Sequence, residues 1–474
     1  MNKIAASLIL TLIYTMASAQ VYAPGNSLTP YHPDKEIRAV WLATIGGIDW
    51  PRTYASTSSA ITRQKQELTD MLDKLKKINI NTVLLQTRVR GTVIYPSKYE
   101  PWDGCMSGKP GVSPGYDPLR FAIDECHKRG MELHAWVVTI PVGKWNNMGC
   151  RLLRQKYPKL ITKTGDEGYL NPEQPQTADY LSDICQEIIK NYNVDGIHLD
   201  YIRYPETWRG RTSKAQGREN ITRIVRKIHD RVKMLKPDVK LSCSPLGKHD
   251  DLARYSSRGW NARTTVCQDA QAWLRDGLMD QLYPMIYFKE NNFYPFAIDW
   301  AEHSKRGQVA AGLGIYFLDP KEGNWKIDEI KRQLNVSRQL GLGQCFFRAK
   351  FLIDNIKGLY DYLRVFNFQQ PRQETVAKEA TISEVSDNKP VGAIPFISSR
   401  KGSVSIPANS KELDADMVMV SSMAGNAITT KRWQDNMLNV SDLQPGMYVL
   451  YSLNRKGNTH RIAYLQILHP ALEQ

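Results

Sequence analysis

Hydrophobic and polar positions follow two regular patterns between about residue 36 and residue 365 of this 474-residue chain. Segments in which every second position is apolar predict strands, and segments with apolar positions three or four apart predict helices. Eight strands are predicted, at 38–43, 82–88, 132–138, 196–201, 240–244, 281–288, 309–316 and 344–348. Helical patterns lie between them, at 62–78, 118–129, 177–191, 221–235, 268–278, 296–305 and 328–340.

This alternation of strands and helices predicts an α/β fold. Eight β–α units over this length match a (β/α)8 TIM-type barrel. An open, doubly wound sheet is the alternative, and such a sheet usually carries a glycine-rich phosphate-binding turn after its first strand. The corresponding positions here are Thr44-Ile45-Gly46-Gly47, which lack the third glycine. We therefore expect the closed barrel.

The two faces of the predicted strands differ in composition. One face is rich in leucine and isoleucine, and we expect it to contact the helices. The other face is polar, aromatic or small, which suits a sugar-sized pocket. For His134, His198 and Ser242 we expect hydrogen-bonded positions deep in the barrel. The helix-facing set is Leu85, Leu133, Leu241, Ile286 and Leu313, and the inward-facing set includes Gln86, Arg88, Trp136, Ser244, Tyr283, Tyr287 and Arg348.

The segment VDGIHLDYIRYP at 194–205 carries the most specific chemical pattern. Its alternation puts Ile197 and Leu199 on one face of a strand and His198 and Asp200 on the other. Asp200 stands at the C-terminal end of that strand, where TIM barrels place their chemistry. Buried acids are rarely kept without a partner or a role. Asp200 is therefore either a catalytic carboxylate or the anchor of a buried polar network.

The composition changes after Phe368. Residues 369–390 are rich in charged and small polar side chains and are typical of a linker. Residues 391–474 contain short alternating runs separated by turn residues, which predicts a small all-β sandwich of fibronectin or immunoglobulin type. In LQPGMY at 443–448 we expect Tyr448 to bond back to the backbone, as in a tyrosine corner. Such a domain either binds glycan or stabilises the barrel.

The N-terminal residues 1–19 match a secretory signal peptide. Lys3 provides the positive start, residues 4–14 are an apolar run, and Ala17-Ser18-Ala19 fits a cleavage site. The run is too short to span a bilayer, and no later segment is apolar enough to do so. We expect an exported protein, periplasmic or extracellular after cleavage. Its barrel domain would span 20–368, followed by the linker at 369–390 and the sandwich at 391–474.

The formal net charge of +15 at pH 7 favours anionic surroundings such as acidic glycans, wall polymers or membrane surfaces. The alternative is that the charge only aids solubility. Nucleic acid is not an expected partner, because an exported protein does not meet it and no single basic arm is present. The seven cysteines are an odd number, so at least one is unpaired; Cys105 and Cys150 are a possible pair. No cysteine or histidine spacing suggests a metal site, and no cofactor is expected.

A series of motifs runs through the predicted barrel in a fixed order. They are EIRAVWL at 36–42, QTR at 86–88, YPS at 95–97, EPW at 100–102, PGYDPL at 114–119, ELHAW at 132–136, the 195–205 segment, SCSP at 242–245 and YPMIY at 283–287. Together they resemble the glycosyl-hydrolase-like 10 family of exported bacterial proteins. The resemblance implies a (β/α)8 barrel, glycoside hydrolysis and, for some members, action on the glycan strands of peptidoglycan.

Glycoside hydrolysis normally needs two carboxyl groups, one to protonate the leaving oxygen and one to act as nucleophile or base. Asp200 is the predicted nucleophile or base, with Arg88 and Arg203 near enough to keep it ionised. Glu290 is the first candidate for the proton donor, because its loop directly extends the aromatic end of the sixth strand. Further candidates are Asp250, Asp251, Asp319 and Glu100, with Asp103 and Glu206 ranked below them.

Substrate-binding residues are expected around these carboxyl groups. Aromatic side chains near strand ends offer platforms for sugar rings. Two arginines offer bidentate contacts to substrate carboxylates, which suits an anionic glycan, although they would also serve to brace Asp200. The predicted set is Gln86, Arg88, Trp136, Arg203, Tyr204 and Tyr287.

We therefore predict an exported glycoside hydrolase that cleaves O-glycosidic bonds of a peptidoglycan-type or related glycan. The main alternative is a non-catalytic glycan-binding protein on a degenerate barrel, because many family members carry a second acid where this chain has Tyr201. A third possibility is a surface scaffold that works through the sandwich, in which case residues 391–474 alone would retain all binding.

Overall fold

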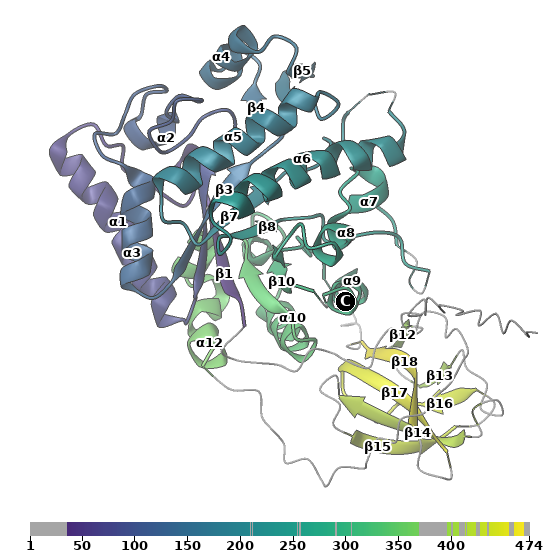
Figure 1. Ribbon diagram of the computed structural model, residues 1–474. Coiled ribbons are helices and arrows are strands. Elements are labelled where there is room, and N and C mark those ends of the chain that lie inside the picture. Colours follow the sequence, from purple (N-terminus) through teal and green to yellow (C-terminus); the bar gives the residue numbers. More distant parts are fainter. Residues whose placement is uncertain are drawn as a thin grey trace, which may run out of the picture.

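A closed barrel of eight parallel strands forms the larger part of the computed structural model (Figure 1). The structure describes residues 36–368 and 396–468, except positions 209, 211, 254, 256, 290, 291, 305, 400, 401, 407–412, 414, 423–426, 434, 435 and 455–458. The barrel strands are β1 (Arg38–Leu42), β2 (Thr82–Arg88), β3 (Glu132–Val138), β7 (Gly196–Asp200), β8 (Lys240–Cys243), β9 (Gln281–Leu282), β10 (Gln308–Leu313) and β11 (Gly343–Phe346). Each pairs in parallel with the next, and β11 pairs with β1, so the predicted TIM-type barrel is confirmed.

Helices surround the strands in the order that the sequence predicts. The long ones are α1 (Ser58–Lys77), α3 (Pro118–Lys128), α5 (Pro175–Asn191), α6 (Lys214–Leu235), α9 (Tyr294–Glu302), α10 (Ile327–Gln339) and α12 (Leu359–Phe366). Shorter ones are α2 (Gly104–Ser107), α7 (Ala262–Thr265), α8 (Ala270–Arg275) and α11 (Ala349–Ile353). Caps fix several starts: the Thr57 hydroxyl accepts from the N–H of Ala60 at α1, and Asp117 accepts from Arg120 at α3.

The sixth barrel strand is much shorter than its sequence pattern. β9 ends at Leu282, whereas the alternation continues to residue 288. Pro284 has no N–H to donate to a ladder, so regular pairing stops before it. Met285 resumes contact through isolated bridges to Leu246 and Gly312. The segment that follows therefore lies at the barrel mouth as irregular chain.

The predicted helix-facing side of the strands is confirmed. The leucines and isoleucines expected to contact helices are all buried in the large cluster between strands and helices: Leu85, Leu133, Leu241, Ile286 and Leu313. A separate cluster fills the inside of the barrel and includes Trp41, Trp136 and Tyr283. Gly196 leaves room there for His134, because a Cβ at Gly196 would lie 2.6 Å from that imidazole ring. Close approach, not backbone conformation, requires this glycine.

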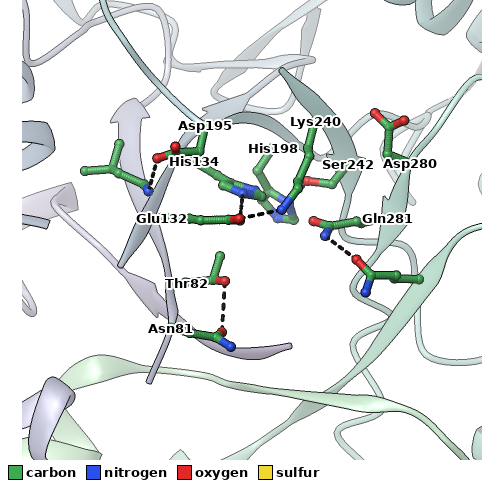
Figure 2. Close-up of polar contacts among 12 residues, drawn as sticks. Asn81, Thr82, Glu132, His134, Asp195, His198, Lys240, Ser242, Asp280 and Gln281 are labelled. Carbon is green, nitrogen blue, oxygen red and sulfur yellow. Dashed lines mark hydrogen bonds and ion pairs between the residues drawn. The ribbon is translucent and has the colours of Figure 1, made fainter. Parts of the chain in front are cut away.

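Polar groups close the end of the barrel at which the strands begin (Figure 2). Glu132, the first residue of β3, accepts from the Lys240 ammonium at 2.5 Å and lies 3.1 Å from Nε2 of His134. Further along the strands, toward their C-terminal ends, Nδ1 of His198 lies 3.0 Å from the Ser242 hydroxyl. His134, His198 and Ser242 are thus hydrogen-bonded barrel residues, as predicted.

An insertion that the sequence pattern does not predict follows β3. It consists of β4 (Pro141–Lys144), α4 (Met148–Lys156), β5 (Ile161–Thr164) and β6 (Glu167–Leu170), before the chain enters α5. The strands form a small antiparallel sheet in the order β4-β6-β5. Because it follows the C-terminal end of β3, this insertion stands at the barrel mouth (Figure 1).

The C-terminal region is all β. β12 (Phe396–Ser399), β14 (Ala415–Ser422), β15 (Ala427–Arg432), β17 (Gly446–Asn454) and β18 (Thr459–Ile467) form one sheet, and β13 (Ser403–Ser405) pairs with β16 (Met437–Asn439). Tyr448 donates to the carbonyl of Gln444 at 2.6 Å, which confirms the predicted bond back to the backbone. Tyr464 and Met447 belong to the main buried cluster, so this region packs against the barrel.

Two further expectations concern cysteines and membrane segments. All seven cysteines are buried and free, including Cys105 and Cys150, so the possible pair between these two is not formed. In the part of the chain that the structure describes, no helix combines the length and apolarity required to cross a bilayer. The signal peptide and the linker predicted at 1–19 and 369–390 lie outside the described residues.

Candidate active site

The carboxyl group of Asp200 ends β7 at the barrel mouth and is 7% exposed. Its Oδ2 accepts a hydrogen bond from Nε1 of Trp136 at 3.1 Å. Its Oδ1 accepts from the Ser244 hydroxyl at 2.8 Å and from the backbone N–H of Tyr201, also at 2.8 Å. Trp136 lies on β3 and Ser244 directly follows β8, so the two strands that flank β7 both hold this carboxyl.

The backbone at Asp200 turns sharply as the strand ends. Tyr201 has a φ of +52°, a left-handed conformation that costs energy for a residue with a side chain. Thr139 holds the turn, because its backbone N–H and its hydroxyl both donate to the carbonyl of Asp200, at 2.9 and 2.8 Å. Backbone strain of this kind is concentrated at functional sites. Here it brings the N–H of Tyr201 onto the carboxylate.

Burial raises the pKa of Asp200 above the ordinary value of an aspartate. Hydrogen bonds from Ser244 and Trp136 and the positive charge of Arg203 act in the opposite direction, and burial outweighs them. A carboxyl group whose pKa is moved toward neutrality is suited to exchanging protons near its working pH. The electrostatic surroundings of Asp200 therefore fit acid–base chemistry.

Arg203, three residues after Asp200, pairs with a second carboxylate. Its Nη1 donates to Oε1 of Glu206 at 2.7 Å, and its guanidinium lies 4.5 Å from the ring centroid of Tyr201. Its Nε is buried without an acceptor among the described residues. The charge of Arg203 lowers the pKa of Asp200, but burial outweighs it, so the expectation that Arg203 keeps this carboxyl ionised stays a prediction. Glu206, which the sequence pattern ranks low, is the carboxylate that Arg203 holds at this end of the barrel.

Tyr287 carries a hydroxyl with no hydrogen-bond partner among the described residues. Burial, together with nearby ionisable groups that include Cys345 and Asp200, raises its pKa well above the ordinary tyrosine value. The hydroxyl therefore stays protonated and is available as a donor. The ring packs against Phe347, with centroids 5.5 Å apart. The role of Tyr287 as a substrate contact stays a prediction.

The floor beneath these residues is aromatic and uncharged. Trp41 packs edge-on against Tyr283 and Phe347, and its Nε1 donates to Nε2 of His198 at 3.2 Å. Burial lowers the pKa of His198 well below its ordinary value, so the imidazole is neutral. A neutral floor keeps the local dielectric low and strengthens the interactions of Asp200.

Arg88 is fully buried and has no hydrogen bond to Asp200, contrary to the predicted roles in binding substrate and in keeping Asp200 ionised. Its Nε and Nη2 donate to Glu100 at 2.7–2.9 Å, and both side chains are fully buried. Tyr180 of α5 donates to the same carboxylate at 2.6 Å. A register shift in the pairing with β3, between Gln86 and Arg88, turns Arg88 toward the helices.

Two other predicted substrate contacts have structural partners. The Gln86 Oε1 accepts from the backbone N–H groups of Thr44 and Ile45, at 3.0 and 2.8 Å, and so shapes the loop after β1. The Tyr204 hydroxyl accepts from Asn220 of α6 at 3.1 Å, and the residue is 5% exposed. Tyr204 therefore braces α6 and is not a sugar platform, because the chain turns back toward that helix after Arg203.

The predicted proton donor, Glu290, lies outside the described residues. Most of the other predicted acids have partners of their own: Glu100 pairs with Arg88, Asp103 accepts from Thr92, Asp250 pairs with Arg263, and Asp251 pairs with Lys248. Within the described ranges, no second carboxylate is hydrogen-bonded to Asp200, and no group of three or more histidine, cysteine or acidic side chains could hold a metal ion.

The sequence pattern misses two features of this site. Ser244 is recognised as an inward-facing residue, but its contact with Asp200 depends on how β7 and β8 are staggered. The left-handed turn at Tyr201 has no signal in the sequence, because the residue is not a glycine, asparagine or aspartate.

The barrel region of the chain matches known proteins in sequence. The Glycosyl hydrolase-like 10 family model matches residues 36–218 and 212–316. Glycosyl hydrolase DigH of Escherichia coli (strain K12) is 31% identical over 392 residues, which cover 71% of this chain and 89% of that protein. Glycosyl hydrolase YngK of Bacillus subtilis (strain 168) is 28% identical over 404 residues, which cover 75% of this chain and 78% of that protein.

Solved structures resemble the chain only distantly. Alpha-L-fucosidase isoenzyme 2 from Paenibacillus thiaminolyticus gives a TM-score of 0.41 at 14% identity, covering 66% of this chain and 46% of that one. The maltogenic alpha-amylase AmyB from Thermotoga neapolitana gives 0.46 at 10% identity, covering 92% and 95%.

Proposed function

The chain belongs to the glycosyl hydrolase-like 10 family, and we propose that it is a glycoside hydrolase that cleaves O-glycosidic bonds of a bacterial cell-wall glycan, of the peptidoglycan type or closely related to it. The observation that carries the proposal is Asp200: a carboxyl at the C-terminal end of a barrel strand, held by Trp136 and Ser244, with its pKa raised by burial. This combination of position, orientation and proton affinity is what carboxylate acid–base catalysis requires.

In the proposed reaction Asp200 acts in its ionised form, as the nucleophile or as the base that activates water. The second carboxyl protonates the leaving oxygen, and Glu290 remains our proposal for it. The Tyr287 hydroxyl donates to a substrate oxygen, because it has no acceptor among the described residues. Arg203 stabilises the ionised form of Asp200 through its charge. No cofactor is part of this scheme.

The net charge of +15 supports an anionic glycan as substrate. The N-terminal signal-like segment supports export, and we propose a periplasmic or extracellular location, where wall glycan is accessible. The names of the two relatives, both glycosyl hydrolases, support the reaction class and do not specify the sugar.

The test compares the full-length wild type with Asp200→Asn on peptidoglycan sacculi and on peptide-free glycan strands. Asp195→Asn is the matched control, since Asp195 precedes the same strand at its opposite end and bonds Leu133 and His127 there. We expect new reducing ends with the wild type and with Asp195→Asn. With Asp200→Asn we expect a loss of at least about 100-fold, with binding to the strands retained.

A second candidate function is glycan binding without hydrolysis. The observation in its favour is that Tyr201 follows Asp200 and that no second carboxylate bonds Asp200 in the described ranges. Binding of strands by the wild type without release of reducing ends would support this candidate and overturn the hydrolase. Absence of both binding and release would overturn both.

A further inference from the structure

A cleft of about 790 Å³ opens beside the small sheet at the barrel mouth. One wall consists of β5 and the turn after it, including Thr162 and Thr164. The other wall consists of Thr207, Trp208 and Gly210, in the segment that follows β7. Its two walls thus come from the C-terminal ends of β3 and β7, which are neighbours in the barrel. None of the contacts described for Asp200 includes a residue of this cleft.

The indole nitrogen of Trp208 is buried and has no acceptor among the described residues. It lies against Gly210, where an added Cβ would come within 2.6 Å of Nε1 and 3.0 Å of the Glu173 carboxylate. Only a residue without a side chain can approach both the indole and the carboxylate this closely. An unpaired N–H costs stability, so an oxygen brought by a ligand would be favoured there.

The other groups of the cleft suit an uncharged, hydroxyl-rich ligand. Trp208 provides a flat ring, and its own packing against Tyr204 is edge-to-face, with centroids 5.5 Å apart. Threonine hydroxyls line both walls, and Glu173 and Lys163 contribute one charge of each sign. Aromatic faces with a few placed polar groups are the usual composition of a sugar site.

The cleft lies within reach of Asp200 along the same face of the barrel. Trp208 follows Asp200 by only eight positions, which limits their distance to about 28 Å. Glu206, held by Arg203, directly precedes the wall segment. The charges of Glu206 and Arg90 affect the pKa of both Tyr201 and Tyr169, so β6 of the small sheet lies close to the chain that follows Asp200.

We infer that this cleft is a second saccharide subsite, which holds a neutral or N-acetylated sugar unit of the same glycan chain whose bond is positioned at Asp200. The inference rests on the proposed function, which identifies the glycan chain. It gives the cleft a role in binding long glycan strands. Trp208 stacks on the sugar ring and its Nε1 donates to a sugar oxygen. Short substrates that end before the cleft do not use it.

The test measures kinetics of the full-length protein on long peptide-free glycan strands and on a short oligosaccharide of N-acetylglucosamine. Trp208→Ala removes the ring, and Thr164→Arg fills the cleft without removing a packed group. Trp260→Ala is the control, because it removes a 61% exposed tryptophan outside the cleft. We expect both cleft variants to raise KM for long strands about five- to tenfold, with kcat unchanged and no effect on the short substrate.

Equal effects on long and short substrates, or no effect of either cleft variant, would overturn the subsite. Circular dichroism excludes misfolding of Trp208→Ala, and Thr164→Arg repeats the test independently. Calorimetry with the long strands separates this inference from the proposed function. If the wild type releases no reducing ends but both cleft variants still weaken binding while Trp260→Ala does not, the hydrolase fails and the subsite stands.

Discussion

The hydroxyl of Ser244 donates a 2.8 Å hydrogen bond to Oδ1 of Asp200, so the end of one barrel strand holds the carboxyl that ends its neighbour. A donor placed on a carboxylate stabilises the ionised form. In this site the bond opposes the effect of burial, which raises the pKa of Asp200. The proton affinity of the proposed catalytic group is therefore a balance between its depth in the barrel and the donors around it.

Removing that donor should shift the pH dependence of the reaction. In Ser244→Ala the pKa of Asp200 rises further, because the ionised form loses a hydrogen bond while burial is unchanged. The acidic limb of the kcat/KM profile should therefore move to higher pH. Ser242→Ala is the control, since Ser242 bonds His198 and not Asp200. Superimposable profiles for Ser244→Ala and the wild type would contradict the role given to this bond.

Tyr287→Phe should separate stability from activity. Its hydroxyl has no partner among the described residues, so its removal should leave the free energy of unfolding unchanged or slightly raised. If the hydroxyl donates to substrate, kcat/KM should fall about tenfold. Tyr283→Phe makes the comparison, because that hydroxyl donates to Gln281 at 2.9 Å and its loss should cost about 1 kcal/mol in urea unfolding.

Arg88 and Glu100 form a fully buried ion pair, so breaking it should be costly. Arg88→Met leaves the Glu100 carboxylate buried without its cation and should destabilise the fold by about 3–5 kcal/mol in denaturant unfolding. The double variant Arg88→Met with Glu100→Leu should recover much of this loss, since no unpaired charge remains. Equal losses in the single and double variants would contradict this explanation.

Glu132 should make the fold sensitive to acid. Burial acts to raise its pKa, but the hydrogen bonds and charges of His134 and Lys240 outweigh burial and lower it to about 2 in the folded protein, below that of an unfolded glutamate. Its contribution to stability is therefore complete above the unfolded pKa and is lost as the pH falls toward 2. In Glu132→Gln this part of the dependence should disappear, as measured by urea unfolding between pH 7 and pH 3. An unchanged pH dependence would refute the assignment.

The sequence identifies most of the barrel because each strand and helix has its own periodicity. The bounds of β2 (Thr82–Arg88) and β3 (Glu132–Val138) coincide with the predicted ranges. The prediction fails where a local feature interrupts the pattern, as Pro284 does in the sixth strand. It also misses the small sheet after β3, whose strands are four residues long and carry little alternation.

Arg88 shows why the site was harder to predict than the fold. Counting alternate residues along β2 puts Gln86 and Arg88 on the same inward face. The register shift between them moves Arg88 to the helix side, where Glu100 and Tyr180 meet it. A shift of one position exchanges the two faces of a strand, and nothing in the local sequence marks where it occurs.

The sequence by itself determined the order of the barrel strands and helices, the leucines and isoleucines that face the helices and the position of Asp200 at a strand end, because these depend on residues close together in the chain. Only the tertiary structure decided which groups bond that carboxyl. Trp136 and Ser244 lie 64 and 44 residues away from Asp200. Such contacts are set by the stagger of neighbouring strands in the closed barrel, which local periodicity does not encode.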